Sequence, residues 1–188
     1  MPDYHHLLPP CWKETVVRWL KEDIPSFDYG GFVVGERQVE AKLLGKTVGV
    51  LCGKPFLNAI FESLECTVEW HADEGVNFEK GTHLATVTGA ARNVLMGERT
   101  ALEVMVRSTS IATHARKFLL LAQEHKWQGR IAGTRKTAPG LRLLDKYSMI
   151  VGGVDTHRMD LSSMIMLKDN HIAIAGSITR AVKEAKSV

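Results

Sequence analysis

The sequence has few cysteines, few aromatic residues and no long apolar run. Its 188 residues include three cysteines, Cys11, Cys52 and Cys66, and none belongs to a C-x-x-C pair. Three cysteines leave one without a partner, so free thiols in a reducing compartment are the simplest interpretation. No stretch approaches the roughly 20 apolar residues that span a bilayer, and the N-terminus lacks the pattern of a signal peptide. We therefore expect an intracellular, soluble protein without a membrane partner.

Charge of either sign is also not in excess. The chain has 24 Lys and Arg against 21 Asp and Glu, a formal net charge of +3. That bias is too small to argue for nucleic acid, and no basic stripe with interleaved aromatics is present. No Walker, H-E-x-x-H or nucleotide-fold glycine pattern occurs. Function must therefore be sought in local clusters of charge.

Hydrophobic periodicity divides the chain into two patterns. Residues 1 to about 90 predict a small α+β unit of two helices and antiparallel strands. Its expected parts are helices at 12–22 and 55–64, strands at 39–43, 66–70 and 84–88, a short apolar run at 48–51 and turns at Gly30–Gly31 and 73–75. The second pattern alternates strands and helices, which is typical of a parallel α/β layer. Its expected parts are helices at 91–108, 112–126, 141–149 and 177–186, with strands at 130–134 and 165–168. Two parallel strands cannot close a barrel, so either further strands are missing or another chain supplies them.

Basic residues cluster after the expected strands. Arg135, Lys136 and Thr137 follow the first strand and precede Pro139-Gly140. In parallel α/β layers, ligands bind beyond the carboxyl ends of the strands, so these cations could face an anion. A solvated basic loop is an equally good interpretation of this cluster alone.

Two further clusters strengthen the case for an anion site. His157 and Arg158 lie in the next loop, and Lys168, followed by Asp169, ends the second expected strand. We expect these groups to converge on one mouth of the layer. Arginine suits carboxylates and lysine suits phosphates, so the ligand would carry both kinds of anion. His157 could carry a proton, or be an ordinary hydrogen-bonded loop histidine.

Other charged residues favour structural interpretations. Arg99, Glu103 and Arg107 are spaced four residues apart on the long helix, as in a ladder of intrahelical ion pairs. Metal chemistry is poorly signalled: His71 and His83 lie on separate strands or turns, and Asp169 is the only acidic candidate at a strand end.

Taken together, the motifs resemble the quinolinate phosphoribosyltransferase family, in one order over nearly the whole chain. The opening, with His6-Leu7-Leu8-Pro9, resembles fungal members in particular. The matching segments are Gly97-Glu98-Arg99-Thr100-Ala101-Leu102, Ala132-Gly133-Thr134-Arg135-Lys136-Thr137, Lys146-Tyr147, Val151-Gly152-Gly153, His157-Arg158-Met159-Asp160-Leu161 and Met166-Leu167-Lys168-Asp169-Asn170-His171.

The resemblance implies a fold and an assembly. The α/β fold would have an N-terminal α+β sandwich-like domain with the long connecting helix, 1–111, and the first part of an open α/β barrel, 112–188. It also implies a homodimer with shared active sites, in which Arg99 reaches the neighbour's site, and leaves room for a higher oligomer. One departure is Ser110, where the family commonly has glycine. If that glycine needs positive φ, serine would strain the turn.

The implied function is a step of NAD biosynthesis. The expected location is the cytoplasm, and the nucleus is a second candidate location. Quinolinate and phosphoribosyl pyrophosphate would give nicotinate mononucleotide, pyrophosphate and CO₂, as in a pentosyltransferase. Arg135, His157 and Arg158 match residues that hold the carboxylates of quinolinate. Lys136, Thr137 and Lys168 match residues near the ribose phosphate and pyrophosphate. The family also implies Mg²⁺, with ligands mostly beyond this chain, which alone would then be inactive. The rival interpretations are a nicotinate phosphoribosyltransferase and a non-catalytic anion-binding or assembly fragment.

Overall fold

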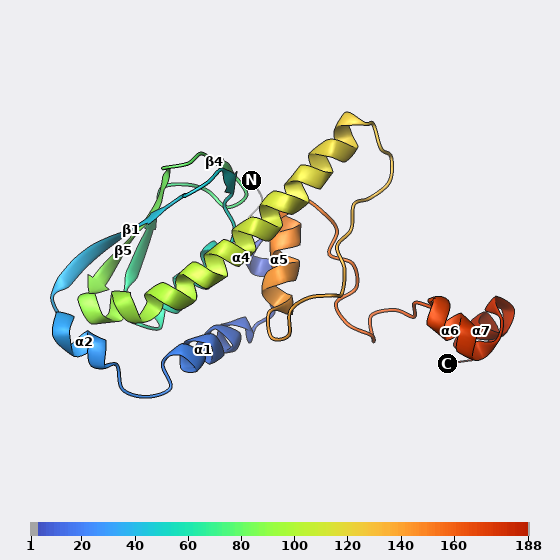
Figure 1. The fold of residues 1–188 in the computed structure, drawn as a ribbon, viewed down its shortest axis with the longest axis horizontal. Helices are drawn as coiled ribbons and strands as arrows, with labels where there is room; N and C mark the ends of the chain where they lie inside the picture. The colour runs from blue at the N-terminus through green and yellow to red at the C-terminus, as the bar shows by residue number, and fades with distance from the viewer. Residues whose placement is uncertain (1–3, 188) are drawn as a thin grey trace.

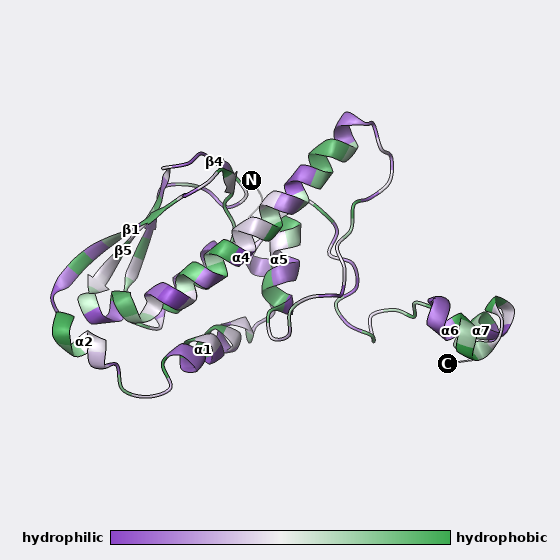
Figure 2. Cartoon of the chain, viewed as in Figure 1, coloured by the Kyte–Doolittle hydropathy of each residue, from purple (hydrophilic) through white to green (hydrophobic). Residues whose placement is uncertain are grey.

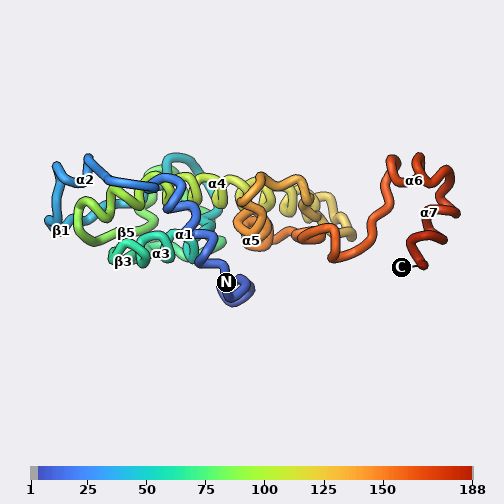
Figure 3. Tube along the Cα trace, turned by 90° about the horizontal axis from the view of Figure 1, so that it is seen from below, coloured from blue at the N-terminus to red at the C-terminus, as the bar shows by residue number. Residues whose placement is uncertain are grey.

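The computed structural model describes residues 4–187 and is a mixed α/β chain organised around one long helix, α4 (Ala91–Glu124). The sheet and α1–α3 lie along the first half of α4, and α5 (Arg142–Gly152) packs against it farther along. Figures 1 and 3 both show α6 (Asp169–Ala175) and α7 (Ile178–Ala185) at one end, apart from the rest. None of the helices in residues 4–187 is long and apolar enough to cross a membrane.

The first helices follow their apolar spacing, with one exception. After a short 3-10 turn, η1 (His5–Leu7), α1 (Trp12–Asp23) buries Trp12, Val16 and Leu20, which recur every four residues as predicted. The turn predicted at Gly30–Gly31 is wrong, because these residues lie in α2 (Tyr29–Val34). A side chain at Gly31 would meet Asp28 Oδ2 at 2.3 Å. That glycine therefore permits close packing rather than a turn.

A three-stranded antiparallel sheet forms the β layer of the N-terminal half. Its order is β1 (Gln38–Leu44), β5 (His83–Ala90), β3 (Thr67–Trp70), and the predicted alternation of β1 is confirmed. A second pair joins β2 (Gly49–Val50) to β4 (Asn77–Phe78), and β4 was not predicted. The core under these strands includes α3 (Lys54–Glu62), which has proline in its first turn as expected and buries Phe56 and Ile60 completely.

The long helix is continuous, so the two predicted helices at 91–108 and 112–126 are one. No proline interrupts α4, and its single glycine, Gly97, packs against Phe61. Ser108 and Ala112 are both buried within it, while Ser110 between them is exposed and helical. Ser110 therefore occupies its position without backbone strain.

The second half contains the expected helices but not the expected strands. α5 and α7 are confirmed, and α6 was not predicted. Of the strand expected at 130–134, only one parallel bridge forms, between Ala132 and Asp155. The run 165–168 pairs with nothing among the described residues, and Ile165 is 62% exposed. An apolar run alone does not make a strand, because a strand needs a neighbour to hydrogen-bond.

Candidate active site

Two backbone segments, 131–135 and 155–158, lie side by side and carry two of the predicted basic clusters. Asp155 donates its amide to Ile131 O at 2.9 Å and accepts from the Gly133 amide at 2.8 Å. The pairing runs in parallel, so both chains leave it in the same direction. Arg135 follows the pairing on one segment, and His157 and Arg158 follow it on the other. The structure therefore brings these two clusters together at one edge, the end of the pairing where both segments leave it.

Both arginines at this edge have an unused donor. The Nε atoms of Arg135 and Arg158 are buried and lack a hydrogen-bond partner in the described part of the chain. Arg158 Nη1 donates to Met164 O at 3.0 Å, which holds the guanidinium against the following loop. Buried N–H groups are nearly always paired, so two orphaned guanidinium donors on adjacent segments indicate a place for an anion.

His157, which directly precedes Arg158, adopts an unusual backbone conformation. Its φ is +60°, in the left-handed region that side chains rarely adopt. Asp155 Oδ1 accepts from the His157 amide at 3.0 Å, and His157 Nδ1 accepts from the Arg158 amide at 2.7 Å. Because Nδ1 is an acceptor, the ring proton of the neutral imidazole must lie on Nε2. The geometry thus offers Nε2–H as a donor to a ligand, and strained residues of this kind concentrate at functional sites.

Two other predicted residues of the first cluster differ in their surroundings. Lys136 has an exposed side chain, and its amide donates to Thr134 Oγ1 at 3.1 Å. Thr137 is half-buried, and its hydroxyl accepts from Arg142 Nε at 3.2 Å. Lys136 is therefore free to meet a solvent-facing group of a ligand, whereas Thr137 already has a contact with α5.

Lys168 does not join the other cations as expected. It is exposed at the N-terminal end of α6, with its amide donating to His171 Nδ1 at 3.2 Å. Figures 1 and 3 show that α6 stands away from α5 and the paired segments. The reason is that 165–168 does not pair with 131–134 as a strand, so nothing in residues 4–187 fixes Lys168 at the same edge.

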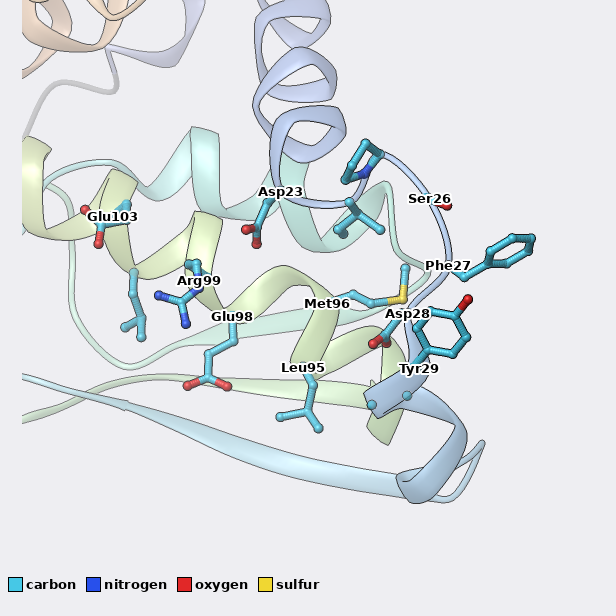
Figure 4. A pocket seen from close by; sticks show the side chains of 15 residues that line it. Asp23, Ser26, Phe27, Asp28, Tyr29, Leu95, Met96, Glu98, Arg99 and Glu103 are labelled. Carbon is cyan, nitrogen blue, oxygen red and sulfur yellow. The ribbon is translucent and has the colours of Figure 1, made fainter.

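Arg99 lies elsewhere, in a cavity between α4 and the segment that joins α1 to α2. The cavity has a volume of about 540 Å³, and Figure 4 shows Arg99 beside Glu98, with Asp23 across from them. No ion pair joins Arg99 to Glu103 in the part of the chain that is described, so the predicted ladder is wrong. Arg107 instead pairs with Asp145 of α5, at 2.6 Å.

Metal ligands are not gathered in the described residues. Within 4–187, no group of three or more His, Cys, Asp or Glu side chains could hold an ion. Asp169, the acidic candidate from the sequence, is exposed at the start of α6. Asp160 accepts hydrogen bonds from Ser162 and Ser163. These bonds lower the pKa of Asp160, and the bond from the Ser163 hydroxyl has the largest effect. The side chains of residues 4–187 do not fit Mg²⁺ binding by themselves.

Comparison with known proteins decides the family. Residues 26–109 match the N-terminal domain of quinolinate phosphoribosyl transferase, and residues 111–188 match its C-terminal domain. The chain belongs to the quinolinate phosphoribosyltransferase family. The predicted α/β fold is confirmed with it, since the chain superposes on NadC from Streptococcus pyogenes with a TM-score of 0.87 and 32% identity, covering 96% of this chain and 66% of that one.

Two curated relatives of this family are closely similar in sequence. Nicotinate-nucleotide pyrophosphorylase [carboxylating] of Dictyostelium discoideum is 48% identical over 199 residues, which cover 97% of this chain and 66% of the relative. The rat protein of the same name is 42% identical over 181 residues, covering 96% and 60%. The chain therefore spans about 60–66% of the length of these relatives.

Proposed function

We propose that the chain serves in phosphoribosyl transfer from phosphoribosyl pyrophosphate to quinolinate, with release of pyrophosphate and CO₂ and formation of nicotinate mononucleotide. The reaction would belong to NAD biosynthesis. The proposed location is the cytoplasm, with the nucleus as a second candidate location. The observation that carries the proposal is the pair of orphaned guanidinium donors of Arg135 and Arg158 on adjacent segments. The names of the relatives favour a carboxylating pyrophosphorylase over an enzyme that uses nicotinate.

The proposed substrate fits the donors at this edge. Quinolinate carries two adjacent carboxylates, and a guanidinium is the side chain best shaped to bind a carboxylate with two parallel hydrogen bonds. Arg135 and Arg158 would each take one, with the Nε2–H of His157 as a further donor. In this role His157 orients a carboxylate and does not move a proton, because its Nδ1 is already occupied by the Arg158 amide.

Orientation and charge account for the chemistry we propose. The pyridine nitrogen attacks the ribose carbon as the pyrophosphate leaves, and the ring acquires positive charge. The bond to the carboxylate next to the nitrogen then breaks and CO₂ departs, leaving the electron pair on that ring carbon beside the ring cation. A proton from water then takes the place of the lost carboxylate and gives nicotinate mononucleotide. Holding the reacting atoms in place can lower a barrier by roughly 7–11 kcal/mol. Lys136 and Thr137 are assigned to the phosphate groups, where the lysine cation stabilises the growing negative charge. The family resemblance assigns Lys168 to the same groups, although it stands away from this edge at the start of α6.

Mg²⁺ is part of the proposal as a cofactor, and no step of the reaction is assigned to it. It would neutralise the phosphates of phosphoribosyl pyrophosphate when bound. The absence of an acidic cluster within residues 4–187 means that the described side chains alone do not account for its binding.

A homodimer with shared sites is the assembly we propose. Arg99 lines a cavity separate from the edge that carries Arg135 and Arg158, so we assign it to the site of a second copy. Its surroundings suit an interface: Phe27, Tyr29 and Phe32 are each more than 80% exposed, and Figure 2 shows hydrophobic residues on α2. Large exposed apolar groups of this kind mark interaction surfaces. A higher oligomer is compatible with this arrangement. As domains we propose 1–111 and 112–188, divided within α4.

The test is CO₂ release by the purified chain. Quinolinate labelled in the carboxylate next to the nitrogen is incubated with phosphoribosyl pyrophosphate and Mg²⁺, and labelled CO₂ and nicotinate mononucleotide are measured. The two products should form in equal amounts. Nicotinate replaces quinolinate in the control. Binding of quinolinate without turnover would favour the anion-binding fragment. Turnover of nicotinate without CO₂ would favour a nicotinate phosphoribosyltransferase. The proposal would be refuted if the chain neither bound quinolinate nor turned it over.

A further inference from the structure

Lys146 of α5 is one of the most deeply buried residues of the molecule. Only 2% of its surface is exposed. Its ammonium donates to the backbone carbonyl of Thr134 at 2.9 Å and also to the carbonyl of Thr156. A lysine is rarely buried to this extent unless it is paired. Here both of its hydrogen bonds go to backbone, so the ammonium links two segments of chain.

The two carbonyls occupy related positions on those segments. The backbone pairing of 131–133 with Asp155 ends immediately before Thr134 and Thr156, and no further backbone hydrogen bond joins the two segments within residues 4–187. Arg135 comes directly after Thr134, and His157 directly after Thr156. The ammonium of Lys146 therefore bridges the segments at the point where the pairing stops and the basic residues begin.

The electrostatic surroundings of Lys146 do not suggest an ordinary ion pair. No carboxylate in the described chain lies within ion-pair distance of its Nζ. Burial lowers the pKa of Lys146 most, the nearby charge of Arg142 lowers it further, and Asp155 and Asp145 oppose both effects. A buried cation without a direct counter-ion is costly, and a hydrophobic residue of the same size would avoid that cost.

We propose that Lys146 is a positioning residue for the anion site. By holding the Thr134 and Thr156 carbonyls to one ammonium, it sets the spacing between Arg135 on one segment and His157 and Arg158 on the other. This role rests on the proposed function as far as quinolinate is concerned. The link between the segments stands on the hydrogen bonds themselves. Lys146 does not touch the substrate.

The first test is amide hydrogen exchange of three variants. Lys146→Met removes the donors and keeps the length of the side chain, while Lys146→Arg keeps a cation that can donate to both carbonyls. Ser148→Ala is the matched control, since Ser148 is also buried in α5 but its hydroxyl donates to Leu144 O within the helix. The amides to follow are those of Gly133 and Asp155, which join the two segments.

Lys146→Met should speed exchange of these two amides by about tenfold or more, with amides in the middle of α4 and in α3 changed far less. Lys146→Arg should restore much of the protection, and Ser148→Ala should not show the selective effect. A uniform increase across the chain would mean that Lys146 contributes only to general stability. That result, or no change at Gly133 and Asp155, would overturn the proposal.

The second test is quinolinate binding by calorimetry with the same proteins. Lys146→Met should weaken binding by about tenfold or more, with Lys146→Arg closer to the parent chain. Equal affinity of the parent and Lys146→Met would overturn the positioning role. If the parent chain binds no quinolinate, the proposed function fails, while the exchange experiment still decides whether Lys146 sets the two segments.

Discussion

Arg107 of α4 and Asp145 of α5 form a two-pronged ion pair, with Nε 2.6 Å from Oδ1 and Nη2 2.9 Å from Oδ2. The carboxylate is buried, with 4% of its side chain exposed, whereas 36% of the arginine side chain is exposed. The hydrogen bonds to Asp145 raise the pKa of Arg107, with burial acting in the opposite direction. The pair therefore holds α5, which lies next to the proposed site, against the long helix α4.

Replacing Arg107 by methionine should destabilise the chain by about 2 kcal/mol. The buried Asp145 carboxylate would lose its partner, and the cost falls below the range for fully buried pairs because water reaches the guanidinium. Urea unfolding would measure it. Arg92→Met is the control, because it breaks an exposed pair with Glu36 and should cost about 0.5 kcal/mol or less. Equal costs for the two variants would contradict the prediction.

Gly53 should be far less replaceable than other glycines with positive φ. Its φ is +112°, and an added Cβ would lie 2.5 Å from Ser108 Oγ, which itself donates to the Cys52 carbonyl. Gly81 has a φ of +90° but nothing within 4 Å of the same position. We expect Gly53→Ala to cost about 2 kcal/mol or more beyond Gly81→Ala, because both carry the backbone strain and only one adds a clash. Chemical unfolding of the two variants compares them, and similar midpoints would show that Ser108 moves aside freely.

Local patterns sufficed for the elements that bury one face. The spacing of Trp12, Val16 and Leu20 predicted α1, and the alternation in β1 predicted its strand, because in both cases the residues of one side face the core. The convergence of Arg135 with His157 and Arg158 was also predicted, since the end of the strand expected at 130–134 and the loop containing His157 were expected at one mouth of the layer.

Pairing between distant residues could not be predicted in the same way. The backbone partner of 131–133 is Asp155 rather than the more apolar run at 165–168. Because that run does not pair with 131–133, Lys168 lies away from Arg135 and Arg158. Arg107 pairs across helices with Asp145, where the spacing along α4 had suggested Glu103. His71 and His83 lie on separate segments as expected, but their ring centroids are 4.4 Å apart, with the rings tilted by 54°, because β3 and β5 are neighbours. Lys146 carried no signal beyond its place in a family motif, since its role depends on two carbonyls from other segments.

Glu74 should make stability depend on pH in a distinctive direction. Its carboxylate accepts from the amides of Gly53 at 2.6 Å and Lys54 at 3.0 Å, yet burial is the larger influence and raises its pKa. The folded chain therefore keeps the proton at pH values where the unfolded chain has lost it. This contribution to stability is complete below about pH 4.3, the usual carboxyl pKa, and is lost as pH rises through the folded pKa.

Relative to Glu74→Gln, the parent chain should thus be most stable near pH 4 and lose that advantage towards pH 7. Unfolding by urea at several pH values, taken as the difference between the two proteins, isolates this residue. Glu79→Gln removes an exposed carboxylate and serves as the comparison. An advantage of the parent chain that grows with pH would mean that the two amides outweigh burial.

Arg135→Ala and Arg158→Ala should each lower quinolinate affinity by at least about tenfold. A charge-assisted hydrogen bond contributes about 1.5–3 kcal/mol, and each guanidinium would offer more than one. Loss of folding stability should be small, because each Nε has no partner within residues 4–187 and Arg158 loses only one exposed hydrogen bond, from Nη1 to Met164 O. Arg180→Ala on α7 is the control, because Arg180 is an exposed arginine that pairs with Glu184 on the same helix. Calorimetric titration measures the affinities, and unchanged binding in both variants would refute an anion site at this edge.

Mixing an Arg99→Ala protein with an Arg135→Ala protein should restore part of the function that each lacks alone. In the proposed homodimer, Arg99 of one copy completes the site whose Arg135 belongs to the other. A hybrid of the two variants then contains one intact site and one doubly defective site. Random exchange of subunits gives half hybrids, so about one quarter of the sites should be intact. Quinolinate binding or turnover, measured after exchange has been verified by differently tagged subunits, reads this fraction. Recovery near a quarter supports a shared site, whereas no recovery places Arg99 outside it and leaves its cavity beside Phe27 and Tyr29 as a feature of the N-terminal half alone.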